Sequence, residues 1–322
     1  MSLLADALQP HITRGLISLG GRPEGFSLPE LLIRRGVAYD VNASLENNAV
    51  ILDFRDPTGI LGAVASDLCR LSSASFQSVH EITPEVENKN GMPWAFVKLY
   101  YAAFYAGHSI MRLLGESCSY FEAKHVQRIS EVATALGRSI PALRAGFYRC
   151  VLNASASGMN CSQARGSVGG AHEAFWSVFG NMLEAVSKLV LTGSMGRADA
   201  QAVFTKLEEL RSVIGQIRGY SWLSGTRNAI QYRHEHGVWF PTQYRAGERQ
   251  KLGRLAAKWK TDPMQLPLST KDGDLNTFVM GSIFIIAVCR TMLLRIAERS
   301  TANARPFVEF GPIALLHQMG AK

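Results

Sequence analysis

Hydrophobic residues recur at helical spacing through most of the chain after residue 92. Residues 94–114 are apolar on nearly all sides, which is typical of a helix in the middle of a bundle. Residues 199–218 alternate steps of four and three between apolar positions, with charged residues in between. Residues 171–191 and 275–299 also have long helical patterns, and 249–259 a short basic one. The periodicity predicts a mainly α protein.

The first 88 residues have a mixed pattern. A short apolar run over 49–54 is followed by Asp-Pro-Thr-Gly, which predicts a strand and a turn. Residues 60–76 are expected to be helical, and Ser27 before Pro29 predicts the start of a short helix within 26–35. The polar stretch 81–91 then indicates a boundary near residue 88.

These patterns divide the chain into a mixed α/β accessory region over 1–88, a helical domain over 89–300 and a tail over 301–322. Within the helical domain, 121–136 and 141–152 are predicted as helices. Residues 153–170 are rich in Ser, Ala and Gly and are predicted as a loop. In the tail, 307–310 is predicted as a short strand that could pair with 50–54.

Composition excludes several classes of protein. With 322 residues, 47% hydrophobic and 19% charged, the chain is long and apolar enough for a globular core. Its five cysteines are scattered without a Cys-x-x-Cys pair, so neither a disulfide framework nor a zinc site is expected, and no cofactor is predicted. The first residues lack an export signal, which favours a cytoplasmic location. The apolar run 278–289 spans about 18 Å as a helix, too short for a membrane core of roughly 30 Å.

The net charge of +8 is concentrated in one window, 211–260. Ten basic residues stand there against two acidic ones, while the rest of the chain is neutral. The basic residues are Arg211, Arg218, Arg227, Arg233, Arg245, Arg249, Lys251, Arg254, Lys258 and Lys260. Such a block attracts polyanions, nucleic acid first among them, although a solvated basic face would look the same.

The segment 226–237, Thr-Arg-Asn-Ala-Ile-Gln-Tyr-Arg-His-Glu-His-Gly, lies inside this window. We expect a helix from about residue 220 or 226 to about 236, ended by Gly237. Seven residues of helix turn through about 700°, so Arg227 and His234 would lie within roughly 20° of each other. Asn228 would border their stripe. A permanent cation and a group that titrates near neutral pH suit phosphate chemistry.

Arg227 and Asn228 followed by His234 resemble the Arg-Asn-x(4–6)-His signature of HEPN domains, the higher eukaryote and prokaryote nucleotide-binding fold. The aromatic and alanine-rich segment 98–108 is similar to the first helix of many such domains. The resemblance covers roughly 92–299 and implies a HEPN-like helical bundle with a mixed N-terminal extension.

The resemblance implies a metal-independent endoribonuclease of a toxin or antiphage defence system. Cleavage of RNA through its own 2′-hydroxyl needs a base, an acid and a cation for the crowded phosphorane. His234 would act as base or acid, Arg227 would bind the phosphate, and Asn228 would orient His234 or the ribose. Because one chain supplies one such histidine, a homodimer is expected. An antitoxin or a nucleotidyltransferase is a further possible partner, and no membrane is involved.

Contacts to the RNA backbone are expected from a larger set of basic residues. These are Arg233, His236, Arg245, Arg249, Lys251 and Arg254.

Three other interpretations remain open. Arg227 could simply pair with a carboxylate, and His234 could stabilise a helix C-terminus. The chain could be a helical module that binds nucleic acid or a nucleotide, or serves as a partner subunit, without cutting anything. A nucleotide-binding loop around Gly166 is also conceivable, although no Gly-Lys-Ser/Thr follows it.

Overall fold

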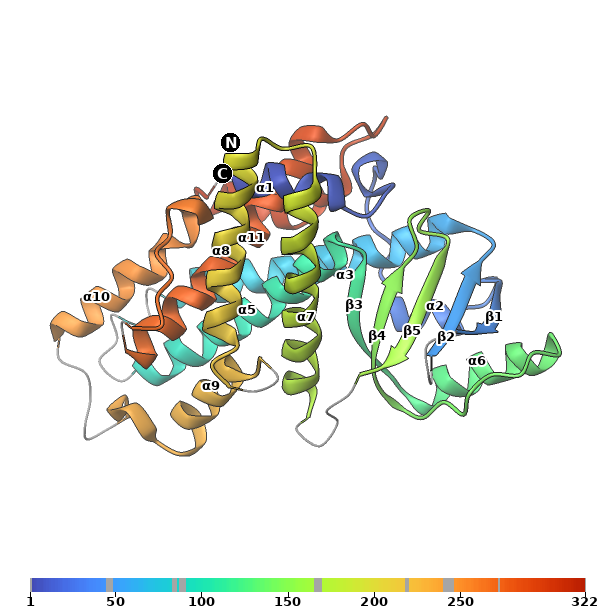
Figure 1. Ribbon diagram of the computed structural model, residues 1–322, viewed down its shortest axis with the longest axis horizontal. Helices are drawn as coiled ribbons and strands as arrows, with labels where there is room; N and C mark the ends of the chain where they lie inside the picture. The colour runs from blue at the N-terminus through green and yellow to red at the C-terminus, as the bar shows by residue number, and fades with distance from the viewer. Residues whose placement is uncertain are drawn as a thin grey trace.

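The computed structural model describes residues 2–44, 49–82, 86, 91–164, 170–217, 220–239, 246–271 and 273–321. It is mainly helical, as the periodicity predicts, with one small antiparallel sheet at one end of the molecule (Figure 1). The helices form the larger part, and Ser2 and Ala321 lie near the same buried arginine, Arg290.

The sheet has five strands in the order β1-β2-β5-β4-β3, all antiparallel. They are β1 Tyr39–Ala43, β2 Ala49–Phe54, β3 Glu116–Phe121, β4 Gly146–Leu152 and β5 Gly158–Gln163. The strand predicted over 49–54 is confirmed. Because β5 lies between β2 and β4, the boundary predicted near residue 88 runs between strands of one sheet.

Three predictions in this region are wrong. The helix expected over 141–152 is replaced by β4, where Tyr148 and Cys150 are buried and Arg149 is half-buried, the two-residue period of a strand. The loop expected over 153–170 contains β5. Residues 307–310 form a 3₁₀ turn and no strand, and they cannot pair with β2 because β1 and β5 occupy both of its edges.

Local capping explains where the first helices begin. Ser27 caps α2, Leu28–Ile33, through a reciprocal hydrogen-bonded box with Glu30, so the predicted start is confirmed. Asp56 accepts a hydrogen bond from the backbone of Thr58 and starts α3, Pro57–His80, with proline in the first turn. Helix α1, Leu3–Leu8, precedes them, and α6, Ala123–Ala135, lies beside α2 and the sheet (Figure 1).

The long helices match the predicted ones closely. They are α5 Met92–Leu113, α7 Ala171–Thr192, α8 Arg197–Ile214 and α11 Asp274–Arg299. The shorter helices of this part are α9 Trp222–Tyr232, α10 Ala246–Ala256 and α12 Pro312–Gln318. The 3₁₀ turns are Gln9–His11, Leu16–Ser18, Glu235–Gly237, Ala257–Lys260, Pro263–Gln265 and Phe307–Phe310. In the described part of the chain, α11 alone is long and apolar enough to cross a membrane, but 94% of its most apolar window is buried inside the fold, so it is a core helix.

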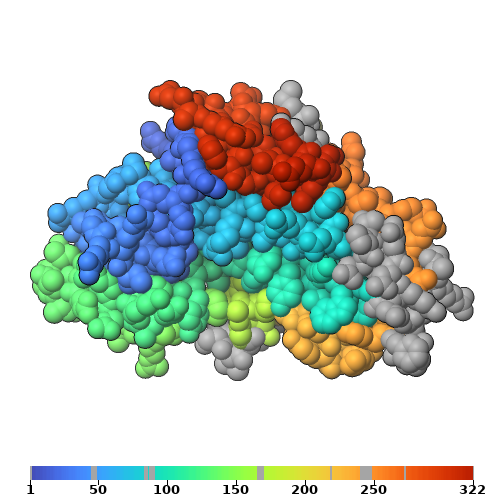
Figure 2. All heavy atoms as spheres, turned by 180° about the vertical axis from the view of Figure 1, so that it is seen from behind, coloured from blue at the N-terminus to red at the C-terminus, as the bar shows by residue number. Residues whose placement is uncertain are grey.

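One continuous core joins the two parts of the molecule. Helix α5 packs along α3 on one side and α11 on the other, and Figure 2 shows the C-terminal segment lying over α3 on the back of the molecule. Inside this core Asp67 of α3 pairs with Arg112 of α5 at 2.9 Å, and both are nearly inaccessible. Burial alone would raise the pKa of Asp67, but Arg112 and Arg70 outweigh it and lower that pKa.

Candidate functional site around Arg227

Helix α9 lies along α5 and ends earlier than the sequence predicts. Its last residue is Tyr232, and His234 and His236 have left-handed backbone angles of φ +53° and +69°. In a longer helix the carbonyl of Ile230 would accept from the backbone N–H of His234. The indole Nε1 of Trp239 occupies that carbonyl instead, at 2.7 Å. The chain therefore turns before His234, and the expectation of a helix to about residue 236 is wrong.

Arg227 and His234 consequently do not share a helical face. Arg227 is buried within α9, whereas His234 is exposed beyond its end. The imidazole of His234 lies 5.4 Å from the ring of Trp239, which packs edge-on against Trp94 of α5. Arg227 instead lies over Tyr101, which is two turns, or about 10 Å of helix rise, further along α5 than Trp94. The two side chains of the predicted pair therefore have different neighbours.

The guanidinium of Arg227 has an unusual set of partners for a side chain that is only 5% exposed. Its carbon lies 4.9 Å from the ring centre of Tyr100, 5.7 Å from that of Tyr101 and 5.9 Å from that of Tyr232. Nη1 donates to Gln231 at 3.2 Å, and Nε is buried without a partner. Among the described residues no carboxylate pairs with it, so aromatic faces and neutral hydrogen-bond partners stabilise the cation.

A second polar group lies on the same aromatic surface of α5. The hydroxyl of Tyr100 is 2.9 Å from Nδ1 of His172, which stands in the first turn of α7. Trp176 donates its indole N–H to that hydroxyl at 3.0 Å. Burial and the nearby charge of Arg227 lower the pKa of His172 to about 4, so the imidazole is neutral at physiological pH.

This arrangement brings together residues that the sequence patterns did not single out. His172 and Trp176 come from α7, Tyr100 from α5 and Arg227 from α9, so they are far apart along the chain. The aromatic run around Tyr100 was recognised as a helix, but nothing in its spacing indicates which side chain meets Arg227. His172 follows a glycine-rich segment, and that position is the one signal that could have drawn attention to it.

The predicted RNA-binding residues lie in several different places. Arg233 is exposed and pairs with Glu235 at 3.0 Å, His236 is half-buried, and Asn228 is exposed on α9. Arg249, Lys251 and Arg254 lie on α10, which stands at the outer edge of the molecule, apart from α9 (Figure 1); Lys251 and Arg254 are exposed and Arg249 is half-buried. Arg245 lies outside the described residues.

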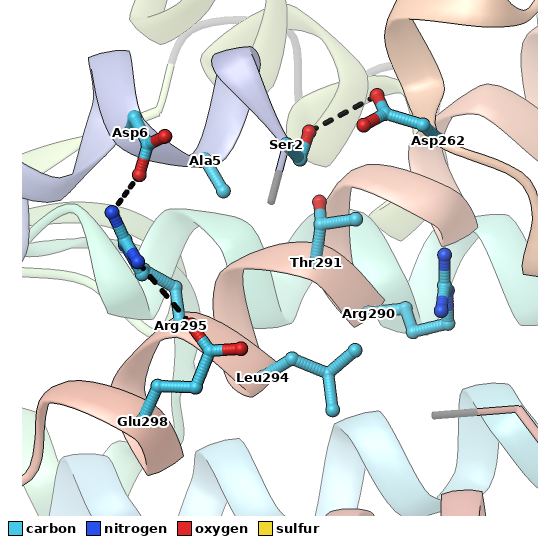
Figure 3. A pocket seen from close by; sticks show the side chains of 9 residues that line it. All are labelled: Ser2, Ala5, Asp6, Asp262, Arg290, Thr291, Leu294, Arg295 and Glu298. Atoms are coloured by element: carbon cyan, nitrogen blue, oxygen red, sulfur yellow. Dashed lines mark hydrogen bonds and ion pairs between the residues drawn. The ribbon is translucent and has the colours of Figure 1, made fainter.

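A separate polar cavity of about 230 Å³ lies between α1 and α11 (Figure 3). Its charged groups are largely engaged with one another, because Arg295 pairs with Asp6 and with Glu298. Arg290 donates to the carbonyl of Ala321 at 3.0 Å. These contacts join the two ends of the chain to α11, so the polar residues of this cavity have a structural role. Within the described ranges no group of three or more metal-ligating side chains occurs.

Comparison with protein-family models, with curated proteins and with solved structures finds no match for this chain. The likeness to HEPN domains therefore rests on the motif and helices named above.

Proposed function

We propose that this protein is a metal-independent endoribonuclease of HEPN type and that Arg227 binds the phosphate at which RNA is cut. The observation that supports this most is the buried guanidinium of Arg227, which has aromatic neighbours, an unsatisfied Nε and no carboxylate partner among the described residues. Burying a charge is costly unless a counter-charge compensates it. A phosphate oxygen would supply that compensation.

The chemistry needs no cofactor. The ribose 2′-oxygen attacks the adjacent phosphorus while its proton passes to a base, and the bond to the 5′-oxygen breaks while an acid protonates that oxygen. The products carry a 2′,3′-cyclic phosphate and a free 5′-hydroxyl. Arg227 would stabilise the charge that builds up on the phosphorane oxygens. His234 is exposed and is the candidate acid or base, contributed by the same chain or by a second copy in a homodimer.

The basic window would hold the RNA backbone. Lys251 and Arg254 on α10 are exposed, as is Arg233 beyond the end of α9. Contacts of this kind supply affinity and not sequence recognition, and they make binding weaken as salt rises. A cytoplasmic role in a toxin or defence system, with an antitoxin or nucleotidyltransferase partner, belongs to the same proposal.

A second candidate is a module that binds RNA or a nucleotide without cutting it. The different surroundings of Arg227 and His234 favour it, because Arg227 is buried against Tyr100 and Tyr101 of α5 whereas His234 is exposed beside Trp239. In this case Arg227 would hold a phosphate and no acid or base would face it.

Incubation of the purified protein with total RNA, with and without EDTA, distinguishes the two candidates. The endoribonuclease gives EDTA-resistant fragments with cyclic phosphate ends, and Arg227→Met and His234→Ala each abolish them. The matched control is Arg55→Met, since Arg55 is an exposed arginine of the sheet region and should leave cleavage unchanged. Intact RNA with a gel shift that Arg227→Met removes would favour the binding module.

A further inference from the structure

The N-terminus of α7 has no side-chain cap among the described residues and lies close to the Arg227 cluster. The helix is 22 residues long, begins after Gly170 and has no side-chain cap. The first backbone N–H groups of a helix have no partner within it and favour an anion. His172 belongs to this first turn.

Tyr100 lies between Arg227 and that turn. The guanidinium of Arg227 lies over the ring of Tyr100, and the hydroxyl of Tyr100 contacts His172. The ring centre of Tyr100 lies 5.5 Å from that of His172 and 4.9 Å from the guanidinium carbon of Arg227, so one aromatic ring adjoins both side chains. A nine-tenths buried cation with an unsatisfied Nε therefore lies near a helix end that has no side-chain cap among the described residues.

The hydrogen bonds around Tyr100 fix which nitrogen of His172 carries the proton. Trp176 can only donate, so it donates to the hydroxyl oxygen of Tyr100. Tyr100 then directs its own proton to Nδ1 of His172. A neutral imidazole that accepts at Nδ1 carries its proton on Nε2. Within the described residues Nε2 has no hydrogen-bond partner, so it is a donor available to a ligand.

We propose that a phosphate group binds between Arg227 and the first turn of α7, where His172 donates its Nε2 proton to a phosphate oxygen. This inference rests on the proposed function for its substrate, an RNA phosphodiester, but the same donors would also hold the phosphate of a nucleotide or inorganic phosphate. His172 thereby becomes a phosphate-binding residue, held in one tautomer by Tyr100, and the acid and base of the cleavage remain elsewhere.

Binding should leave a signature in the titration of His172. Among the described residues, the titratable and charged groups around it are Tyr100, Tyr101 and His108 from α5 and Arg227 from α9, and Glu173 follows it in the first turn of α7. Arg227 disfavours a second positive charge there. A bound anion offsets Arg227 and adds an acceptor, so it should raise the pKa of His172 toward the ordinary value for histidine.

The test is an NMR titration of the full chain with labelled histidine, with and without inorganic phosphate. The His172 resonance is assigned by its loss in His172→Gln, and His317 in the C-terminal helix serves as an internal control. We expect phosphate to raise the pKa of His172 in the wild type, to leave His317 unchanged and to have no effect on His172 in Arg227→Met. An unchanged His172 at saturating phosphate overturns the inference.

A binding series then separates this inference from the proposed function. A short RNA with a 2′-O-methyl group at each position cannot attack its own phosphates and binds without being cut. His172→Phe should weaken its binding about tenfold, while His172→Asn, which keeps a donor, restores most of it. If phosphate moves the pKa of His172 but wild-type protein never cuts RNA, the phosphate site stands and the endoribonuclease fails. If RNA is cut and His172→Phe binds and cuts like wild type, the site fails and the endoribonuclease stands.

Discussion

Replacing Arg227 by methionine should make the free protein more stable while removing its ligand binding. Methionine has nearly the same length and fills the space between α9 and the aromatic face of α5 without a charge. A residue kept only for packing would show the opposite result. The variant therefore tests whether Arg227 serves ligand binding at a cost to the stability of the fold.

The expected magnitude follows from three opposing contributions. The arginine gains about 0.5–2 kcal/mol from its aromatic neighbours and about 1 kcal/mol from its hydrogen bond to Gln231, both of which the variant loses. Against this, desolvating a buried ion costs several kcal/mol, and no carboxylate in the described part of the chain pairs with Arg227 to offset that cost. We expect Arg227→Met to raise the free energy of unfolding by about 1–2 kcal/mol, or the Tm by about 1.5–3 °C.

Urea unfolding followed by circular dichroism measures this change directly. Arg233→Met is the matched control, because Arg233 is exposed and lies just beyond the same helix, and its effect should stay within about 0.5 kcal/mol. Saturating phosphate should stabilise the wild type and not Arg227→Met, since only the wild type binds it. A loss of more than about 1 kcal/mol in Arg227→Met, without phosphate, would refute the reasoning and assign Arg227 to the structure.

Three further predictions concern the surroundings of the site. Asp67→Asn should cost about 3–5 kcal/mol in urea unfolding, because it leaves Arg112 buried without a counter-charge, and a cost below 1 kcal/mol would show that solvent reaches the pair. Gly107→Ala should destabilise by about 1–3 kcal/mol and weaken phosphate binding, because the added Cβ would lie 2.8 Å from the ring of Phe175 and push α7 away from α5; an unchanged Tm would contradict this. The low pKa of His172 means that unfolding takes up a proton between pH 6.5 and about 4, so stability should fall as the pH drops through this window, by less than about 3 kcal/mol because the ring is half exposed. His172→Gln should flatten that dependence, and an identical pH profile would be inconsistent with it.

Most of the helices can be predicted from local patterns in the sequence. Their apolar positions repeat every three or four residues, and any helical bundle can bury such a stripe whatever the order of its helices. Helices α5, α7, α8 and α11 therefore occur where the pattern predicts them. The helix start at Ser27 and the strand over 49–54 could also be predicted, because a helix cap and a short apolar strand depend on residues that are close in the sequence.

Strand pairing and the site were decided by tertiary structure. The sequence could not show that β5 lies between β2 and β4, because those strands come from distant parts of the chain. The end of α9 depends on Trp239, whose indole occupies a helical carbonyl from outside the helix. The surroundings of Arg227 likewise come from three helices: it lies over Tyr100, whose hydroxyl contacts His172, while His234 lies beyond the end of α9. Local periodicity determines which residues form a helix, whereas the contacts between helices determine which side chains share a charge environment.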